Sequence, residues 1–359
     1  MGFLKTIWLG KLTSPKRLRL YVWLSLATQI LIVVTGGLVR LTASGLGCPT
    51  WPKCTVESLV STPEMGIHGI IEFGNRLLTF VLLVVALLTF ATIFRMHSAK
   101  SKLVLPTVVF FGSVLALVLS LVALVRFGLV WPVITFFVLI FVSVVGTTIW
   151  FIQTANCKEP RGILVPSFGL GLGIIAQAVV GGITVLTELN SWVVGLHFLI
   201  SSYLIALASV LVFRALPKPM GEIAPLNRRL RWPIALTSVT SIVFGVIVTG
   251  AGPHAGDANT PRNGLDLEIW QHYHSYPGYL MAALILIALI AQARVSAAWS
   301  SYPYRALVIL MLVTAAQATL GVVQARMGVP ALLVGIHMLG AAVLCSLVMF
   351  HWLSARAKK

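Results

Sequence analysis

The sequence predicts an all-α polytopic membrane protein, with two duplicated four-helix bundles plus an inserted helical hairpin and about ten transmembrane helices. Three observations lead to this fold class: the composition, a succession of long apolar runs, and an internal repeat. Of the 359 residues, 58% are hydrophobic and only 10% are charged. A soluble domain is roughly one quarter charged, so this chain has too little polar surface to face water on all sides.

The apolar runs predict the number of helices, because a helix needs about 20 apolar residues to cross the hydrocarbon core. Runs of that kind lie near 20–41, 66–94, 103–125, 130–152, 163–186, 190–213, 232–250, 267–292, 303–325 and 329–353. Their length indicates helices, since barrel strands would give short alternating segments. No small-residue cleavage site precedes the first run, so we expect no cleavable signal peptide.

The net charge is +17, and the basic residues are distributed along the chain as the topology of a membrane protein requires. Clusters of Lys and Arg precede the first span and follow every second span, which places them all on one side of the membrane. The loops on the other side hold only scattered basic residues, namely Lys53, Arg126, Arg262 and Arg326. This positive-inside pattern predicts a cell-membrane protein with both termini cytoplasmic. The basic charge is thus a topology signal, and we expect the lipid bilayer, with no nucleic acid, as the partner.

An internal repeat organises the spans. The stretch Gln177–His197 aligns without a gap with Gln317–His337, at a constant offset of 140. A weaker echo relates Gly37 to Gly245 at the larger offset of 208. The difference between the two offsets gives the number of extra residues in the first half, and that number is the length of two spans with their loops. The hairpin at 103–152, which is rich in Val, Leu and Phe and contains no His, is the expected insert. The sequence assigns it no role. Parallel repeats imply a pseudo-two-fold axis along the membrane normal. We therefore expect an N-terminal bundle at 1–213 that includes the hairpin, a cytoplasmic linker at 214–231, and a C-terminal bundle at 232–359.

Histidines near the outer ends of the spans are the first candidate functional residues, because ionisable side chains are costly inside a membrane. The repeat makes His197 equivalent to His337, and His68 has a counterpart in His274 at an offset of 206. His272 is the alternative to His274; both cannot face the same way, and we favour His274.

Each predicted bundle thus receives two histidines. Two imidazoles facing each other across a four-helix bundle are suited to bind a haem iron. Zinc would require three or four ligands. A single membrane histidine is about as often a hydrogen-bonded core residue, but four histidines placed by a repeat favour the ligand interpretation.

The second span carries further polar side chains on one helix face: His68, Glu72, Asn75 and Arg76. Glu72 is either the ion-pair partner of Arg76 or a reactive carboxylate. Arg76, and Arg40 at the end of the first span, are placed to reach haem propionates. In the first outside loop, Cys48 and Cys54 lie close together on the oxidising side, where we expect a disulfide. Two free thiols are the alternative.

These residues resemble the haem A synthase family, as an actinobacterial-like variant, over essentially the whole chain except the inserted hairpin. The motifs are "GGLVRLTASGLGCPTWPKC" (36–54), "IEFGNRLLT" (71–79), "QAVVGGITVLTELNSWVVGLHF" (177–198), "VTGAGPHAGD" (248–257) and "VGIHMLGAAVL" (334–344). The resemblance implies a membrane oxidoreductase that converts the ring methyl of haem O to the formyl of haem A, for terminal oxidase assembly. It implies haem b as the cofactor, and haem O synthase and an electron acceptor such as quinone as partners.

Carried over residue by residue, the resemblance assigns His274 and His337 to haem b and His197 to the substrate haem. Glu72 is similar to the family's essential carboxylate, and Cys48 with Cys54 to its outer-loop pair. One departure is specific: the family pattern reads Glu-x-x-His, whereas this chain has Asn75 in place of that histidine. Either His68 supplies the second ligand or the substrate iron is held differently.

Two other functions fit parts of the pattern. A bis-haem membrane electron-transfer cytochrome explains the paired histidines, but requires neither Glu72 nor an asymmetry at Asn75. A transporter would place its polar groups at the midplane, whereas these histidines lie near the outer ends. The electron acceptor and the oligomeric state are open, with a homo-oligomer among the options.

Overall fold

The computed structural model describes residues 12–98, 100–127, 131–155 and 162–356. In these ranges ten helices are long and apolar enough to cross a membrane, as the apolar runs predicted, and no strand occurs. In chain order they are α2 (Leu18–Leu41), α3 (Gly66–Met96), α4 (Lys100–Phe127), α5 (Trp131–Ala155), α6 (Leu164–Leu186), α7 (Ser191–Ala215), α8 (Pro225–Ala251), α9 (Leu267–Val295), α10 (Tyr302–Arg326) and α11 (Ala331–Arg356). Two short 3-10 helices, Pro15–Arg17 and Pro63–Met65, precede α2 and α3. Residues 1–11 and 357–359, which the expected topology places in the cytoplasm, lie outside the described residues.

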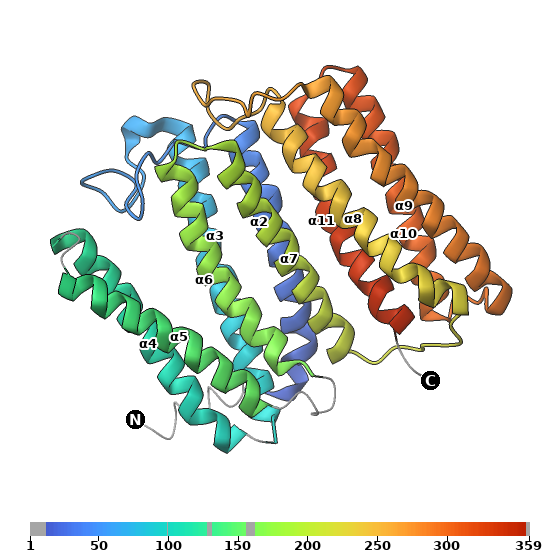
Figure 1. The fold of residues 1–359 in the computed structure, drawn as a ribbon, viewed down its shortest axis with the longest axis horizontal. Helices are drawn as coiled ribbons and strands as arrows, with labels where there is room; N and C mark the ends of the chain where they lie inside the picture. Colours follow the sequence, from blue (N-terminus) through green and yellow to red (C-terminus); the bar gives the residue numbers. More distant parts are fainter. Residues whose placement is uncertain (1–11, 99, 128–130, 156–161, 357–359) are drawn as a thin grey trace.

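Eight of these helices form two four-helix bundles. In the first bundle α2 packs on α3, α3 on α6, α6 on α7, and α7 on α2, so the helices close a ring. In the second, α8, α9, α10 and α11 close a ring in the same order. Consequently α3 and α7 lie diagonally across the first bundle, and α9 and α11 lie diagonally across the second (Figure 1).

The contacts between the bundles have the symmetry of a duplication. Helix α2 packs on α11, α8 packs on α7, and α7 packs on α11. In the duplication α2 corresponds to α8, and α7 corresponds to α11. The contact of α2 with α11 therefore corresponds to that of α8 with α7, and the contact of α7 with α11 corresponds to itself. The structure therefore has the pseudo-two-fold arrangement that the repeat predicted, with α7 and α11 next to the axis.

All loops that join the two helices of an α2–α3, α6–α7, α8–α9 or α10–α11 pair lie at one end of the bundles, here called the loop end. They comprise 42–65, 187–190, 252–266 and 327–330. Large apolar side chains cover the outer faces of the helices, and Phe80 and Leu312, for example, are each 65% exposed. Apolar exposure on this scale indicates a surface that contacts lipid.

The inserted hairpin is α4 with α5, and it lies beside α3 and α6 on the side away from the second bundle (Figure 1). Aromatic rings attach it: Phe151 of α5 stacks on Phe168 of α6 with ring centroids 4.2 Å apart, and Phe110 of α4 meets Phe168 at 4.7 Å. The hairpin therefore adds to the outside of the first bundle and contributes nothing to the ring of four helices.

One helix boundary differs clearly from the expectation. Helix α8 begins at Pro225, seven residues before the predicted 232, so the first two turns of the helix occupy part of the expected linker. Proline suits the first turn because its missing N–H would have no helical partner there. The apolar run could not show these turns, since Arg228, Arg229 and Arg231 are charged.

Candidate functional site

The second bundle brings two predicted ligands together. His274 of α9 and His337 of α11 face each other from the diagonal helices, with ring centroids 6.1 Å apart. Metal–imidazole nitrogen bonds are about 2 Å long, so two imidazoles on one metal have centroids roughly 6 Å apart. The pair therefore has the spacing that one bis-histidine haem iron requires.

Neighbouring helices position these two rings. The Nδ1 of His274 lies 2.8 Å from the carbonyl oxygen of Ser241 and donates to it, which leaves Nε2 for a metal. Gly245 of α8 lies against the same ring, and a Cβ there would sit 2.9 Å from His274 Cε1. On the other side, Gly321 of α10 faces His337. Both glycines make room for an imidazole between the helices.

The first bundle repeats half of this arrangement. The amide of Gln177 donates to the main-chain oxygen of His197 at 2.8 Å, as Gln317 donates to His337 at 2.9 Å. Gly181 lies against the His197 ring as Gly321 lies against His337. Among the described residues, neither ring nitrogen of His197 has a hydrogen-bond partner. His197 on α7 is thus the structural equivalent of His337, as the offset of 140 predicted.

The position opposite His197 in the first bundle differs from its counterpart in the second bundle. The structure therefore corrects the predicted equivalence of His68 and His274. His68 lies in the first turn of α3, is exposed, and its Nδ1 lies 2.9 Å from the Ser44 hydroxyl in the loop 42–65. Asn75, two turns further along α3, faces Gly36 of α2, just as His274 of α9 faces Gly245 of α8. Asn75 therefore occupies the place that corresponds to His274.

The glycine echo is also shifted, by one residue. A Cβ on Gly37 would meet Met338 of α11, so Gly37 lies at the contact between the bundles. Gly36 faces the bundle interior and is the counterpart of Gly245.

Glu72 and Arg76 hold the cysteine loop against α3. The buried Glu72 carboxylate accepts the main-chain N–H of Cys48 through Oε2 at 2.6 Å and pairs with Arg76 through Oε1. Arg76 also donates to the main-chain oxygens of Cys48 at 2.8 Å and Thr50 at 3.0 Å. Cys48 and Cys54 form a disulfide, as expected, with Cα atoms 4.5 Å apart. The ion pair thus exists, and it also fixes the loop over the first bundle.

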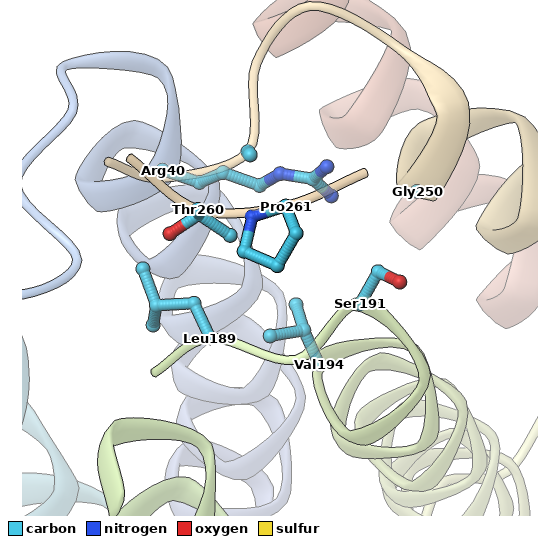
Figure 2. A pocket seen from close by; sticks show the side chains of 8 residues that line it. Arg40, Leu189, Ser191, Val194, Gly250, Thr260 and Pro261 are labelled. Carbon is cyan, nitrogen blue, oxygen red and sulfur yellow. The ribbon is translucent and has the colours of Figure 1, made fainter. Parts of the chain in front are cut away.

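Arg40 lies at the junction of the bundles. Its guanidinium donates to the main-chain oxygen of Thr249 at the end of α8, at 2.5 Å, and to that of His254 in the loop 252–266. Figure 2 shows this side chain extended along a small cavity, over Thr260 and Pro261 and toward Gly250. The Arg40 guanidinium is thus bound to backbone oxygens, whereas we expected it to reach a propionate.

A larger open cavity of 540 Å³ lies at the loop end of the second bundle. Its lining includes Arg262, Gln271 and Val329. The sequence placed Arg262 only among the scattered basic residues of the outer loops. The structure shows a cation at the mouth of the bundle that holds the histidine pair.

The internal repeat also pointed to other positioning residues, to which the sequence analysis gave no role. Gln177 and Gln317 recur at the repeat offset, as do Gly181 and Gly321, and the contacts above give both pairs a function. In the described part of the chain, no three His, Cys, Asp or Glu side chains come together as a metal cluster would require. The two-histidine site is thus the metal-binding geometry that these residues offer.

Comparison with known proteins gives matches that agree in name. The chain is 28% identical to Heme A synthase of Geobacillus thermodenitrificans over 114 residues, 32% of this chain and 33% of that protein. It is 29% identical to Heme A synthase of Geobacillus kaustophilus over 80 residues, 22% of this chain and 24% of the relative. With Heme A synthase of Lysinibacillus sphaericus it shares 36% over 72 residues, 19% of this chain and 22% of the relative.

The matched part of the chain spans no more than 33% of the length of these curated relatives. A scan against protein-family models finds no match.

Proposed function

We propose that this chain, which belongs to the haem A synthase family, oxidises the ring methyl of haem O to the formyl of haem A. The three relatives support the family and an oxidoreductase role. One observation supports the specific reaction: the two bundles share a fold but carry different polar groups. The second has a symmetric histidine pair, whereas the first has one matching histidine, Asn75, and a buried carboxylate beneath a disulfide loop.

The second bundle is proposed to bind haem b. His274 and His337 are spaced to bind its iron, and Arg262 at the mouth supplies a cation for its carboxylates. Haem b held there by His274 and His337 would supply one-electron redox chemistry. Ser241 holds the His274 imidazole, and Gly245 and Gly321 leave room for the two rings between apolar helices.

The first bundle is proposed to bind the substrate haem O through His197. Conversion of a methyl to a formyl group with oxygen from water releases four electrons and four protons, so an external acceptor must take the electrons. We assign Glu72 the role of a general base that accepts a proton or orients water. Its position beneath the loop 42–65 supports this role, because the loop separates the carboxylate from bulk water.

The proposal includes a topology and partners. The positive-inside pattern supports cytoplasmic termini, which puts the loop end and its disulfide on the outer side of the cell membrane. Haem O synthase is the expected source of the substrate, and a quinone is the expected electron acceptor. Both partners are taken from the family.

Expression of the chain in a host that makes haem O but no haem A tests the function. Acid extraction and chromatography of the haems should give a new peak with the mass of haem A and its red-shifted spectrum. The same host without the chain is the blank, and a His337→Ala chain is the loss-of-cofactor control. Red protein that yields only haem B and haem O, with a quinone acceptor present, would favour the electron-transfer cytochrome.

A further inference from the structure

The two haem pockets differ in one ligand position, and that position decides how the iron is coordinated. In the second bundle the ring of His274 lies against Gly245, opposite His337. In the first bundle the corresponding place against Gly36 holds Asn75, which lies on the helix diagonal to His197. Superposing one half on the other through the repeat therefore puts an amide where the second imidazole would be.

We propose that the iron in the first bundle has a single protein ligand, His197, and that Asn75 leaves the opposite coordination position open to a small ligand. The inference deepens the proposed function and rests on it only in taking the first bundle as a haem pocket. It assigns one bis-histidine haem and one mono-histidine haem to the same chain.

The local contacts of Asn75 support a positioned side chain. The Thr35 hydroxyl of α2 donates to Asn75 Oδ1 at 2.8 Å, which holds the amide in place beside α2. Asn75 Nδ2 has no hydrogen bond among the described residues and remains a free donor. Amide oxygens are hard ligands that suit Ca²⁺ and Mg²⁺ better than a haem iron. The free donor is instead suited to a hydrogen bond with a small molecule bound on the iron.

The alternative ligand, His68, is bound elsewhere. Its ring lies two turns from Asn75 toward the loop end, is exposed, and contacts Ser44 of the loop 42–65. Two turns of helix correspond to about 11 Å along the axis. An imidazole at that height could not take the place that His274 takes in the second bundle without a shift of α3 or a break in its first turns.

Carbon monoxide distinguishes the two coordination states, because it binds a reduced haem with an open position and not a stable bis-histidine haem. We would purify the chain from a host that makes haem O, confirm two haems per chain, reduce it, and titrate with CO. One CO should bind per chain, and the oxidised protein should show one high-spin and one low-spin haem by electron paramagnetic resonance.

Variants at one position make the test specific. Asn75→His should convert the first haem to bis-histidine coordination, so CO binding falls from one per chain to near zero and the high-spin signal disappears. Asn75→Leu, similar in size but without the donor, should keep one CO per chain and raise the C–O stretching frequency, because the donor near the bound CO is gone. His68→Ala should change neither CO stoichiometry nor spin state.

Two low-spin haems without CO binding in the wild-type chain would overturn the proposal, most directly if His68→Ala then opened a CO site. Failure to bind a second haem after loading with haem O would overturn it as well. The spectra do not depend on turnover: if no haem A forms but one CO binds per chain, the proposed function fails and this coordination stands.

Discussion

At the scale of single residues, close approach of helices decides where an imidazole fits. A Cβ at Gly245 would sit 2.9 Å from His274 Cε1, closer than real Cβ contacts, so Gly245→Ala must displace the ring. We expect the variant to lose most of its low-spin haem, measured per protein by the haem absorbance after purification. Gly171→Ala in α6 is the matched control, because a Cβ there meets nothing within 4 Å. Equal haem content in the two variants would contradict this positioning role.

Glu72 has two possible roles, support of the loop and proton transfer, and paired variants separate them. Glu72→Gln keeps an oxygen for the Cys48 N–H but removes the base, so haem b should stay bound while haem A formation falls by about 10²-fold or more. Arg76→Gln removes the donors to the loop and the ion-pair partner, but keeps the carboxylate. It should retain more activity and show a more accessible disulfide, measured by reduction and thiol labelling. Equal haem A yields in the two variants would leave Glu72 only a structural role.

The wrong pairing of His68 with His274 has a physical cause. His197 and His337 follow from the repeat because the helix pairs that carry them are joined by loops of equal length. The loop 42–65 is longer than the loop 252–266, so an offset measured on α2 and α8 does not extend to α3 and α9. His68 therefore matched His274 by number, while Asn75 matches it in space. The contacts of Arg40 with Thr249 and His254 depend on the packing of two bundles, which no local pattern contains.

At the scale of elements, the sequence predicted the ten helices well because lipid requires long apolar runs. The boundaries of α8 were the exception, since its first turns carry charge outside the apolar run. The sequence did not predict a function for α4 and α5. In the structure the hairpin packs on α3 and α6 from outside, through residues such as Phe110 and Phe151. Among the described residues the hairpin contacts α3 and α6, and it lies outside the ring of helices that carries His197.

Removal of the hairpin should accordingly leave the proposed haem site of the second bundle intact. In the second bundle, α9 connects to α10 by the short link 296–301, so the same link can join Met96 directly to Leu164 in a shortened chain. We expect this variant to keep its low-spin haem b spectrum and to have a lower melting temperature, because Phe90 and Phe168 lose their aromatic partners Phe151 and Phe110. A shortened chain that inserts in the membrane yet lacks haem b would show that the hairpin supports the whole fold.

At the scale of the whole molecule, the two bundles meet through α2, α7, α8 and α11. Near the axis the buried hydroxyls of Ser209 and Ser346 are hydrogen bonded at 2.9 Å, and Arg40 joins the bundles at the loop end. Such an interface can hold two pieces of chain together without a covalent link. The repeat predicted that there are two bundles, but only the helix contacts show which helices form the interface between them.

A chain divided between Pro219 and Met220 tests whether each bundle is a domain. Residues Glu222 and Ala224 are bound to Gln292 of α9, so the piece from Met220 keeps the contacts that start α8. We expect the two pieces to copurify when they are expressed together and to give the low-spin haem of the intact chain. The piece from Met220 alone should bind one haem, because both His274 and His337, with Gly245 and Gly321, lie within it. A piece that inserts in the membrane but binds haem only with its partner would show that the first bundle shapes the second pocket, and the two halves would then be one cooperative unit.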